Sequence, residues 1–401
     1  MVSSLDVYLN TTHKQKVGIL AQKDKKIYFE YDKEFLKTGL QLSPYKLPLK
    51  PGLFTCEDDT FGGIWGVFAD SLPDGWGQLL LERHFIKHGI NPNTLTPLDK
   101  LALIGDDAMG ALSYEPSQPL PGEFEDIILD DLAKNSQEIL QGESDELVEK
   151  LLSLNGSSAG ARPKVLVQMS DDLQHIAHSK LPLKEGYSHW IVKFASSTDS
   201  KEIGAIEYAY SLMAKEAGLD MPQTALLKTT KGRYFAIKRF DRIGSQRVHM
   251  HSVAGLVHSD FRFPTLDYDD LLGLTMHFTK DIKEVQKLFR LACLNLFAHN
   301  RDDHAKNFSF LMDANGKWRL SPVYDLTFSF GPNGEHSTMY MGEGRNPTVE
   351  HLRELAQKHH IKNGSAIIEE THEIVKRFKE FADIAGLSKK SVKTIENSFV
   401  L

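Results

Sequence analysis

A helical pattern that ends in a polar loop constrains this chain more than any other feature of its sequence. Over residues 281–298 the apolar side chains recur at helical spacing and fall on one face, which predicts a helix with that face in a core. The polar run 300–307 follows directly and leads into the apolar run 308–311. We therefore expect a loop whose polar side chains are held between well-packed elements.

Three residues in and after this loop have the types and spacing of a phosphoryl-transfer site. Such a site needs a carboxylate that orients the attacking hydroxyl and oxygen ligands that hold Mg²⁺. Asp302 and Asn307 lie five residues apart, and Asp325 comes eighteen residues after Asn307, in the run 323–326, where it follows a short apolar strand-like stretch. In isolation, an Asp and an Asn at this spacing are more often turn formers, whose side chains bond nearby backbone groups. The elements upstream decide between these interpretations.

The chain has the size and composition of a globular protein with more than one core. Its 401 residues, 41% of them apolar, are enough for two or three domains without disulfide bonds. Cys56 and Cys293 have no CxxC or CxxH neighbours, so neither a disulfide framework nor a zinc site is indicated. Because the sequence has no membrane-length apolar run and no signal-peptide core, we expect a cytoplasmic protein without membrane contact.

The charge and histidine content restrict the expected ligands. A formal charge of −7 argues against unaided tight binding to nucleic acid, because that affinity depends on Lys and Arg side chains that neutralise phosphates. Any DNA contact would need a basic patch or a basic partner. The seventeen histidines are scattered, and pairs such as His359–His360 and His249–His251 lack further ligands at useful spacing, so a structural metal site is not expected.

The pattern along the chain divides it into four segments. Residues 1–115 begin with an antiparallel meander at 5–31 and contain no catalytic constellation, so we interpret them as a packing and interaction module. Residues 116–146 are rich in Pro and acidic residues, which is typical of a connector followed by helices. Strand patterns dominate residues 147–242, and helical patterns dominate residues 243–401.

A loop of small residues precedes the first strand of the third segment. It contains Ser157, Ser158, Ala159, Gly160 and Ala161, and small side chains at such a place let backbone N–H groups approach an anion closely. The loop is neither a Walker motif nor a strict GxGxxG. A flexible turn is therefore at least as consistent with this stretch alone as a phosphate-binding loop.

A lysine in the strand predicted at 189–194 points to nucleotide chemistry. Lys193 stands among apolar neighbours, where a charge is costly unless it is paired. The helix predicted at about 203–217 offers Glu207, and a strand Lys paired with a helix Glu is how protein kinases hold the lysine on the α- and β-phosphates. The alternative is a surface lysine on an edge strand.

Further strands at 224–227 and 234–238 complete a predicted five-strand small lobe. They lead into residues 239–242, where an adenine would bond the linker backbone and where we expect Asp241 to reach the ribose. Helices complete a C-terminal lobe at about 349–358, 364–385 and 388–398. The predicted fold class is α+β, with a β-rich N-terminal subdomain followed by a protein-kinase-like bilobal fold that has a β-sheet small lobe and an α-helical large lobe.

The sequence resembles the HipA family of bacterial serine/threonine protein kinases, the toxins of type II toxin–antitoxin pairs linked to persistence. The likeness runs over nearly the whole chain, and its most specific strings are Asp-x-His-Ala-Lys-Asn-Phe-Ser from Asp302 to Ser309 and Arg-Phe-Asp-Arg from Arg239 to Arg242. The other elements that carry it are Leu72-Pro73-Asp74, Ile104-Gly105, Ser157 to Lys164, Lys193, Glu207 and Tyr324-Asp325.

The resemblance implies a role for each residue of the predicted site. Asp302 would be the catalytic base, Asn307 and Asp325 would be the Mg²⁺ ligands, and Ser157 would be the autophosphorylated serine, with adjacent Ser158 as the competing acceptor. Lys193 would contact the ATP phosphates, and Lys238 and Phe240 would be adenine-binding linker positions. The full set of implied ATP-binding residues is Ser157, Ser158, Ala159, Gly160, Ala161, Lys193, Glu207, Lys238, Phe240, Asp241, His304 and Lys306.

One position departs from ordinary protein kinases. They carry a lysine two residues after the base, where this chain has His304. This arrangement is closer to the Asp-x-His-x-x-Asn of lipid kinases. We therefore expect His304 to take part of the charge-neutralising role of that lysine.

The resemblance also implies cofactors, partners and a cellular role. These are ATP and Mg²⁺, a HipB-like antitoxin through which DNA is mainly contacted, and a protein substrate such as an aminoacyl-tRNA synthetase or another translation protein. Two alternatives are a catalytically weak scaffold that binds the antitoxin and co-represses an operon, and a small-molecule kinase of the aminoglycoside or lipid type. The intact set Lys193, Asp302, Asn307 and Asp325 favours an enzyme over a scaffold, and residues 1–115 have no explanation in a small-molecule kinase.

Overall fold

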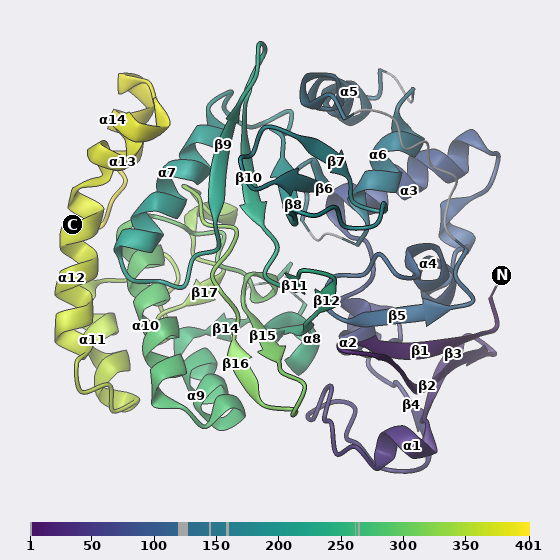
Figure 1. Ribbon diagram of the computed structural model, residues 1–401. Helices are drawn as coiled ribbons and strands as arrows, with labels where there is room; N and C mark the ends of the chain where they lie inside the picture. Colours follow the sequence, from purple (N-terminus) through teal and green to yellow (C-terminus); the bar gives the residue numbers. More distant parts are fainter. Residues whose placement is uncertain (1, 119–126, 144–145, 158–159, 261, 264) are drawn as a thin grey trace.

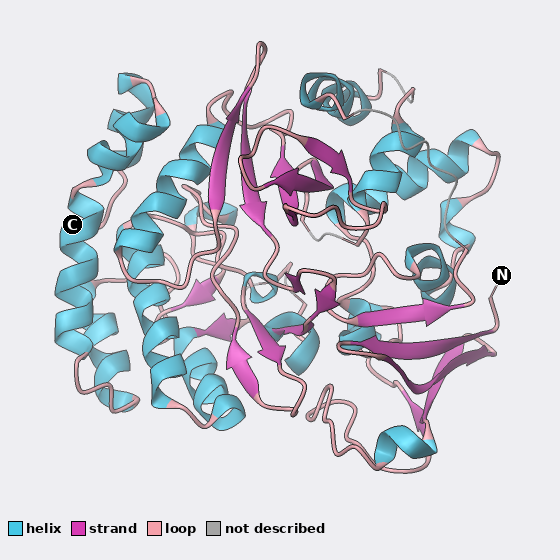
Figure 2. Ribbon diagram, viewed as in Figure 1, coloured by secondary structure: helices cyan, strands magenta, loops and turns pink. Residues whose placement is uncertain are grey.

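The computed structural model describes residues 2–118, 127–143, 146–157, 160–260, 262–263 and 265–401. The chain forms an N-terminal β-rich subdomain, a lobe built around a second sheet, and a helical lobe (Figure 1). Runs of consecutive strands and runs of consecutive helices occur along the described residues, without a regular strand–helix alternation (Figure 2). The α+β fold class predicted from the sequence is confirmed.

The first sheet is antiparallel and has the strand order β4–β3–β2–β1–β5. Its strands are β1 (Ser4–Asn10), β2 (Lys14–Lys23), β3 (Lys26–Tyr31), β4 (Leu53–Thr55) and β5 (Leu112–Glu115). The meander predicted at residues 5–31 is confirmed, and strand alternation puts Leu5, Val7 and Leu9 in the core. The helices of this part are α1 (Lys33–Leu36), α2 (Gly66–Ala69), α3 (Gly75–Lys87) and α4 (Pro97–Ile104).

The second sheet has five strands in the order β7–β6–β8–β10–β9, as the small-lobe prediction required. They are β6 (Lys164–Ser170), β7 (Ile176–His178), β8 (Tyr187–Lys193), β9 (Thr224–Lys228) and β10 (Arg233–Lys238). An apolar cluster joins the sheet to α5 (Leu129–Gln141), α6 (Val148–Asn155) and α3, the last through Trp76 and Leu80. Helix α7 (Ile203–Glu216) contacts β9 and β10 and also the helical lobe. Thus α3, which precedes the second sheet by many residues, belongs to its core.

The helical lobe is built around α10 (Ile282–Phe297), the helix predicted before the polar loop. Its predicted apolar face is confirmed, because Val285, Leu288, Phe289, Ala292 and Leu296 are each at most 1% exposed. The other helices are α8 (Val253–Val257), α9 (Tyr268–Thr279), α11 (Val349–Lys358), α12 (Gly364–Lys376), α13 (Phe378–Ala385) and α14 (Lys389–Glu396). None of the helices in the described ranges combines the length and the apolar character needed to span a membrane.

Short strands support the loops between these helices. β13 (His249–Ser252), β15 (Ser309–Met312) and β16 (Trp318–Leu320) form an antiparallel sheet in the order β13–β15–β16. Two smaller pairs are β11 (Arg242–Ile243) with β12 (Gln246–Arg247), and β14 (Leu266–Asp267) with β17 (Thr338–Met339). Because β15 begins directly after residues 300–307, the polar loop is fixed between α10 and a strand, as expected.

Two local predictions are wrong. The strand-like stretch before Asp325 forms no strand, and Asp325 itself adopts a left-handed conformation with φ 58°, which prevents a strand from continuing through it. The single helix predicted at 364–385 is broken at Arg377 into α12 and α13. This break directs Phe378 into the core, where its ring centroid lies 5.7 Å from that of Tyr210.

Candidate active site

A buried lysine connects the second sheet to the loop after β16. Lys193, at the end of β8, lies with its Nζ 2.9 Å from Glu207 Oε2 on α7 and 2.5 Å from Asp325 Oδ1. The predicted Lys193–Glu207 pair is confirmed, and the surface-lysine alternative is excluded because Lys193 is only 9% exposed. Burial opposes a charge here, but Asp325 and Glu207 together raise the pKa of Lys193 above its usual range. The lysine is therefore cationic.

Asp325 is ionised and partly open to solvent. Burial alone would raise the pKa of its carboxyl, but the charges of Lys193, Lys164 and Arg162 hold that pKa well below its usual range. Its side chain is 27% exposed, although it lies between cations. The left-handed backbone at this residue turns the carboxylate toward Lys193. A hard cation could therefore approach a carboxylate that is already negative.

A second lysine, Lys164, lies beside Lys193, and no individual role for it was predicted from the sequence. The two residues face each other across β6 and β8, where they are register partners. Burial lowers the pKa of Lys164 to about 8, with the neighbouring charge of Lys193 acting in the same direction and Asp325 opposing it. Its position in the sequence, shortly after the small-residue loop, could have indicated that Lys164 lies near the site.

The loop after α10 separates two adjacent aspartates into different environments. Asp303 is 1% exposed and accepts hydrogen bonds from the Tyr268 hydroxyl, the Ser337 N–H and His336, so it is a structural residue. Asp302 keeps 47% of its side chain exposed. Partial burial and then the charge of Asp325 raise the pKa of Asp302, while His304 opposes the shift. Only Asp302 of this pair is accessible to an incoming hydroxyl.

His304 directly precedes the short 3-10 turn Ala305–Asn307, and Asn307 is the last residue of that turn. His304 Nε2 is 3.9 Å from Asp302 Oδ1, which brings the imidazole beside the predicted base. The Asn307 side chain donates from Nδ2 to the Asp302 carbonyl at 2.7 Å. This bond orients the amide and leaves its Oδ1 as the atom that a metal would use, so the donor chemistry fits Mg²⁺.

An aspartate of the N-terminal subdomain clamps the small-residue loop to the polar loop after α10. Asp74, just before α3, accepts from the Gly160 N–H at 2.6 Å through Oδ1 and from Lys306 Nζ through Oδ2. Trp76 N–H donates to the Gly160 carbonyl at 3.0 Å. Gly75 makes this approach possible, because a Cβ there would lie 2.6 Å from that carbonyl oxygen. No site residue was expected in this subdomain from the sequence, although Asp74 belongs to the Leu72-Pro73-Asp74 string of the family resemblance.

Within the small-residue loop, Ser157 is fully buried. Its N–H donates to the Asp107 carbonyl at 3.3 Å, and its Oγ accepts from the Met109 N–H at 2.8 Å. Ser158 and Ala159 lie outside the described residues. Ala161 is exposed. The conformation described here therefore turns the Ser157 hydroxyl toward the N-terminal subdomain.

The linker after β10 lies next to Asp325. Phe240 is half-buried, and its ring centroid is 5.6 Å from that of Tyr324, the neighbour of Asp325. Tyr324 in turn donates its hydroxyl to the Lys306 carbonyl at 2.7 Å. Lys238 is also half-buried and has its backbone N–H bonded to the Gln223 carbonyl. The structure thus brings one of the two predicted adenine-binding positions, Phe240, close to the predicted metal-binding loop.

The prediction that Asp241 reaches a ribose is wrong. Its side chain is 1% exposed, and its oxygens accept from Arg239, from Arg242 and from the Gly110 N–H at 2.8 Å. Burial would raise the pKa of Asp241, but the two arginines hold it well below its usual range. The carboxylate is committed to joining the linker to the N-terminal subdomain.

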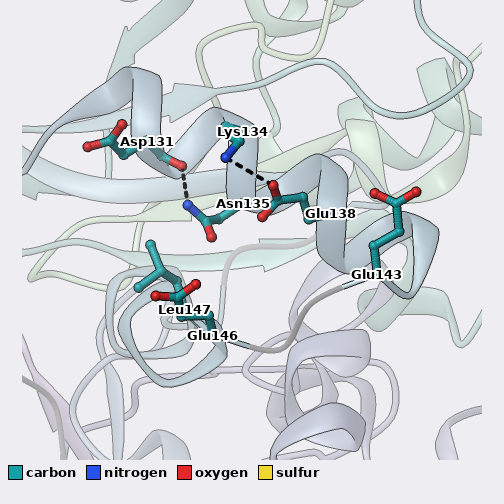
Figure 3. A pocket seen from close by; sticks show the side chains of 7 residues that line it. All are labelled: Asp131, Lys134, Asn135, Glu138, Glu143, Glu146 and Leu147. Carbon is teal, nitrogen blue, oxygen red and sulfur yellow. Dashed lines mark hydrogen bonds and ion pairs between the residues drawn. The ribbon is translucent and has the colours of Figure 1, made fainter.

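A surface hollow lies apart from these residues, between α5 and the start of α6 (Figure 3). Its lining contains the ion pair Lys134–Glu138, and Asn135 donates to the Asp131 carbonyl. The remaining lining residues are Glu143, Glu146 and Leu147. The excess of acidic groups disfavours a triphosphate, and the hollow contains none of the predicted site residues.

Comparison with known families accounts for both halves of the chain. Residues 5–115 match the HipA N-terminal domain, and residues 156–382 match the HipA-like C-terminal domain. The second match alone covers more than half of the sequence. The chain belongs to the HipA family.

A solved HipA structure has the same fold. It is the HipA of Shewanella oneidensis MR-1 in a toxin–antitoxin complex with HipB and operator DNA, with a TM-score of 0.70, 17% identity, and coverage of 98% of this chain and 94% of that chain. A curated relative, a putative kinase of Haemophilus influenzae, is 25% identical over 135 residues, which are 30% of this chain and 39% of that protein. The match therefore spans about two fifths of that relative. A Helicobacter pylori proinflammatory kinase, CtkA, aligns with a TM-score of 0.33, 14% identity, and coverage of 52% of this chain and 92% of that chain.

Proposed function

We propose that this HipA-family protein is an ATP-dependent serine/threonine protein kinase and the toxin of a toxin–antitoxin pair. The observation that carries the proposal is the Lys193–Glu207–Asp325 chain, which ties a small-lobe lysine to a carboxylate in the helical lobe. The accessible carboxylate of Asp302 and the oriented amide of Asn307 lie in the adjacent loop. Protein kinases need these parts together to position phosphates and a hydroxyl.

Each residue has a distinct task in the proposed reaction. Mg²⁺, when bound, neutralises charge on the β- and γ-phosphates. Asn307 and Asp325 would hold it through oxygen atoms, and Lys193 would contact the α- and β-phosphates. Asp302 would accept the proton of the substrate hydroxyl as that oxygen attacks the γ-phosphorus and the bond to the β-phosphate oxygen breaks. His304, beside Asp302, would supply positive charge near the transferred group.

The cellular partners follow from the family. We propose a HipB-like DNA-binding antitoxin, because the similar Shewanella HipA is found with HipB and operator DNA. The net charge of −7 supports DNA contact mainly through that partner. The proposed division of labour assigns interaction to residues 1–115, a connecting role to 116–146, and the two kinase lobes to 147–242 and 243–401. The proposed substrate class is an aminoacyl-tRNA synthetase or another translation protein.

The direct test is phosphoproteomics of cells that express either the wild-type protein or Asp302→Asn at matched levels. Sites phosphorylated only with the wild-type protein identify the substrate and its acceptor residue. Serine or threonine acceptors in a translation protein are expected. If the two proteomes are the same and purified protein with Mg·ATP transfers no phosphate, the kinase proposal is wrong and the co-repressor scaffold takes its place.

We further propose that Ser157 is an autophosphorylation switch. A phosphoserine carries about −1.5 to −2 charges, and it could not occupy the buried place where Ser157 Oγ now accepts from Met109. Modification would hold the loop away from the nucleotide and turn the kinase off. Because the hydroxyl faces the N-terminal subdomain, the loop must open first, and we expect one molecule to phosphorylate another.

Intact-mass and peptide mass spectrometry after incubation with Mg·ATP tests the switch. Phosphate on Ser157 is expected to accumulate faster at higher protein concentration and to be absent in Asp302→Asn. Phosphate on Ser158 alone would move the switch to that residue. Full ATP binding by the Ser157-phosphorylated form would disprove the switch and leave the kinase proposal untouched.

A further inference from the structure

Two histidines and a glutamate converge on the side of the molecule where α3 meets α6. His84 and His88 lie one helical turn apart on α3, and Glu149 lies at the start of α6. One potential ligand atom from each residue lies within 4.8 Å of the others, and the two imidazole centroids are 4.4 Å apart. An i, i+4 histidine pair on one helix face is a recurrent way to present two nitrogen ligands to a metal.

His84 is buried with a nitrogen that lacks a hydrogen bond. The residue is 7% exposed, and among the described residues its Nδ1 has no hydrogen-bond partner. Glu149 Oε1 lies 3.7 Å from this nitrogen, which is beyond hydrogen-bonding distance. A buried polar atom of this kind is costly unless something binds it. The unsatisfied nitrogen therefore points to a ligand between the imidazole and the carboxylate.

His88 is already oriented as a metal ligand. Its Nδ1 lies 2.8 Å from the His84 carbonyl, and because a carbonyl only accepts, Nδ1 must carry the proton. The lone pair then resides on Nε2. Metal-bound histidines commonly donate their other ring N–H to a backbone carbonyl, which fixes the tautomer and the ring. His88 is exposed, so this edge of the cluster is open to solvent.

We propose that His84, His88 and Glu149 form a binding site for Zn²⁺ or a similar divalent transition metal, with water in the fourth position. Two imidazoles and one carboxylate suit Zn²⁺, whereas Mg²⁺ prefers oxygen ligands alone. Tetrahedral bonds of about 2.0–2.1 Å place ligand atoms roughly 3.4 Å apart, so no pair of ligand atoms must close by more than about 1.4 Å. Rotation of exposed His88 and half-buried Glu149 can supply this movement.

Lys87 forms an ion pair with the Glu149 carboxylate. Its Nζ lies 3.1 Å from Glu149 Oε1 and 3.3 Å from Oε2, and its side chain is 44% exposed. An exposed ion pair of this kind contributes little stability, so the ammonium can leave when a metal binds. This arrangement makes Lys87 a competitor of the metal. Removal of the lysine should strengthen metal binding, a result that an ordinary surface ion pair would not produce.

The site links two elements of the kinase framework. Helix α6 ends at Asn155, two residues before Ser157, and α3 begins at Gly75, next to Asp74. A metal held by both helices would restrain their relative movement and with it the start of the small-residue loop. The proposal concerns metal binding alone, so it stands or falls independently of kinase activity.

Titration calorimetry with Zn²⁺ on the full chain, in excess Mg²⁺ to occupy oxygen-only sites, tests the proposal. One Zn²⁺ is expected to bind the wild-type protein, with affinity reduced at least about tenfold in His84→Ala, His88→Ala and Glu149→Gln. Lys87→Ala should bind more tightly than the wild type. Matched controls are His13→Ala and Glu143→Gln, exposed residues outside the cluster, which should leave the affinity unchanged.

Cobalt substitution gives a readout that does not depend on folding energetics. Co²⁺ bound by two imidazoles and a carboxylate should produce a visible absorption band in the wild type and in Lys87→Ala, and no such band in His88→Ala. Since His88 is exposed, its replacement leaves the core intact even if His84→Ala misfolds. Equal Zn²⁺ affinity in the wild type and His88→Ala would overturn the site, and unchanged affinity in Lys87→Ala would remove Glu149 from the ligand set.

Discussion

Asp241 and Asp325 both lie next to cationic side chains, yet their surroundings differ. Asp241 is enclosed, and its two oxygens accept from two arginines and a backbone N–H of another subdomain. Asp325 keeps 27% of its side chain exposed and accepts from Lys193 through Oδ1. Both carboxyls have strongly lowered pKa values. A lowered pKa therefore does not by itself separate a structural carboxylate from a catalytic one.

Two properties distinguish a structural carboxylate from one that can act in catalysis: its exposure to solvent and the number of its acceptor positions that remain unoccupied. A carboxylate with all its acceptor positions occupied by the protein has none left for a metal, whereas one that is ionised and open to solvent retains that capacity. The same rule separates Asp303, which is buried and saturated, from Asp302, which is exposed. Substitutions of these aspartates therefore test whether accessibility separates chemical from structural roles.

Asp302→Asn should abolish most phosphoryl transfer while the fold and nucleotide affinity are retained. An amide can orient the hydroxyl but cannot take its proton, so we expect the rate to fall by roughly 10²–10⁴. Single-turnover transfer from labelled ATP measures the effect. Asp303→Asn is the contrasting variant, and it should lose stability rather than chemistry. Wild-type activity in Asp302→Asn would refute the assignment of the base.

Asp325→Ala and Asn307→Ala should weaken Mg·ATP binding and activity together. Each removes an oxygen ligand of the proposed metal, and we expect kcat/KM to fall by about a hundredfold. Raised Mg²⁺ should partly rescue Asn307→Ala, since Asp325 remains. Calorimetric titration with Mg·ATP checks both variants. Unchanged affinity in Asp325→Ala would transfer the metal role to another residue.

Asp241→Asn should affect stability rather than chemistry. Its loss leaves Arg239 and Arg242 buried without their counter-charge, which costs about 3–5 kcal/mol in the free energy of unfolding. Activity per folded molecule should stay close to that of the wild type. Denaturant unfolding and active-site-normalised kinetics measure the two quantities. A selective loss of ATP affinity with unchanged stability would restore the ribose prediction.

Asp74→Asn should loosen the small-residue loop. It removes the charge that holds Lys306 and weakens the bond from the Gly160 N–H, so we expect KM for ATP to rise on the order of tenfold. Asp32→Asn is a matched control, because Asp32 caps α1 in the same subdomain away from the site. Equal KM values in the two variants would show that the clamp has no role in nucleotide binding.

The pH dependence gives the smallest effect. Asp302 must be ionised to act as a base, and its pKa is raised above the ordinary 3.8, so kcat should fall as pH falls through that raised value. Asp241 has a lowered pKa, so its contribution to stability is present above its unfolded pKa and is lost only as pH falls through the folded value. Activity should therefore decline at a higher pH than the Asp241-dependent part of the stability. Parallel kcat and unfolding profiles test this order.

Periodicity predicted the framework and one contact of the site correctly. Strand alternation and helical spacing identified Lys193 and Glu207 as partners, and the apolar face of α10 matches the predicted one residue for residue. These features depend on local spacing, which the sequence displays directly. The roles of Asp302, Asn307 and Asp325 in transfer remain predictions for the variants above.

The missed features depend on contacts between distant segments. Lys306 and Asp74 are separated by 232 positions, and Asp241 and Gly110 by 131, so periodicity carries no information about either pair. For Asp241 a local signal existed, because arginines flank it in the Arg-Phe-Asp-Arg string. The i, i+4 spacing of His84 and His88 was also visible, whereas Glu149 on another helix was not. The residue types in the sequence indicated which chemistry was available, but only the three-dimensional fold showed which side chains contact one another.

The contact between Asp241 and the N-terminal subdomain also determines whether the two parts of this protein can fold separately. The Gly110 N–H closes its carboxylate cluster, and Trp76 and Leu80 complete the apolar core of the second sheet. A kinase fragment that started at residue 147 would leave both surfaces uncovered. We therefore expect a chimera of two relatives to fold only when both segments come from the same protein.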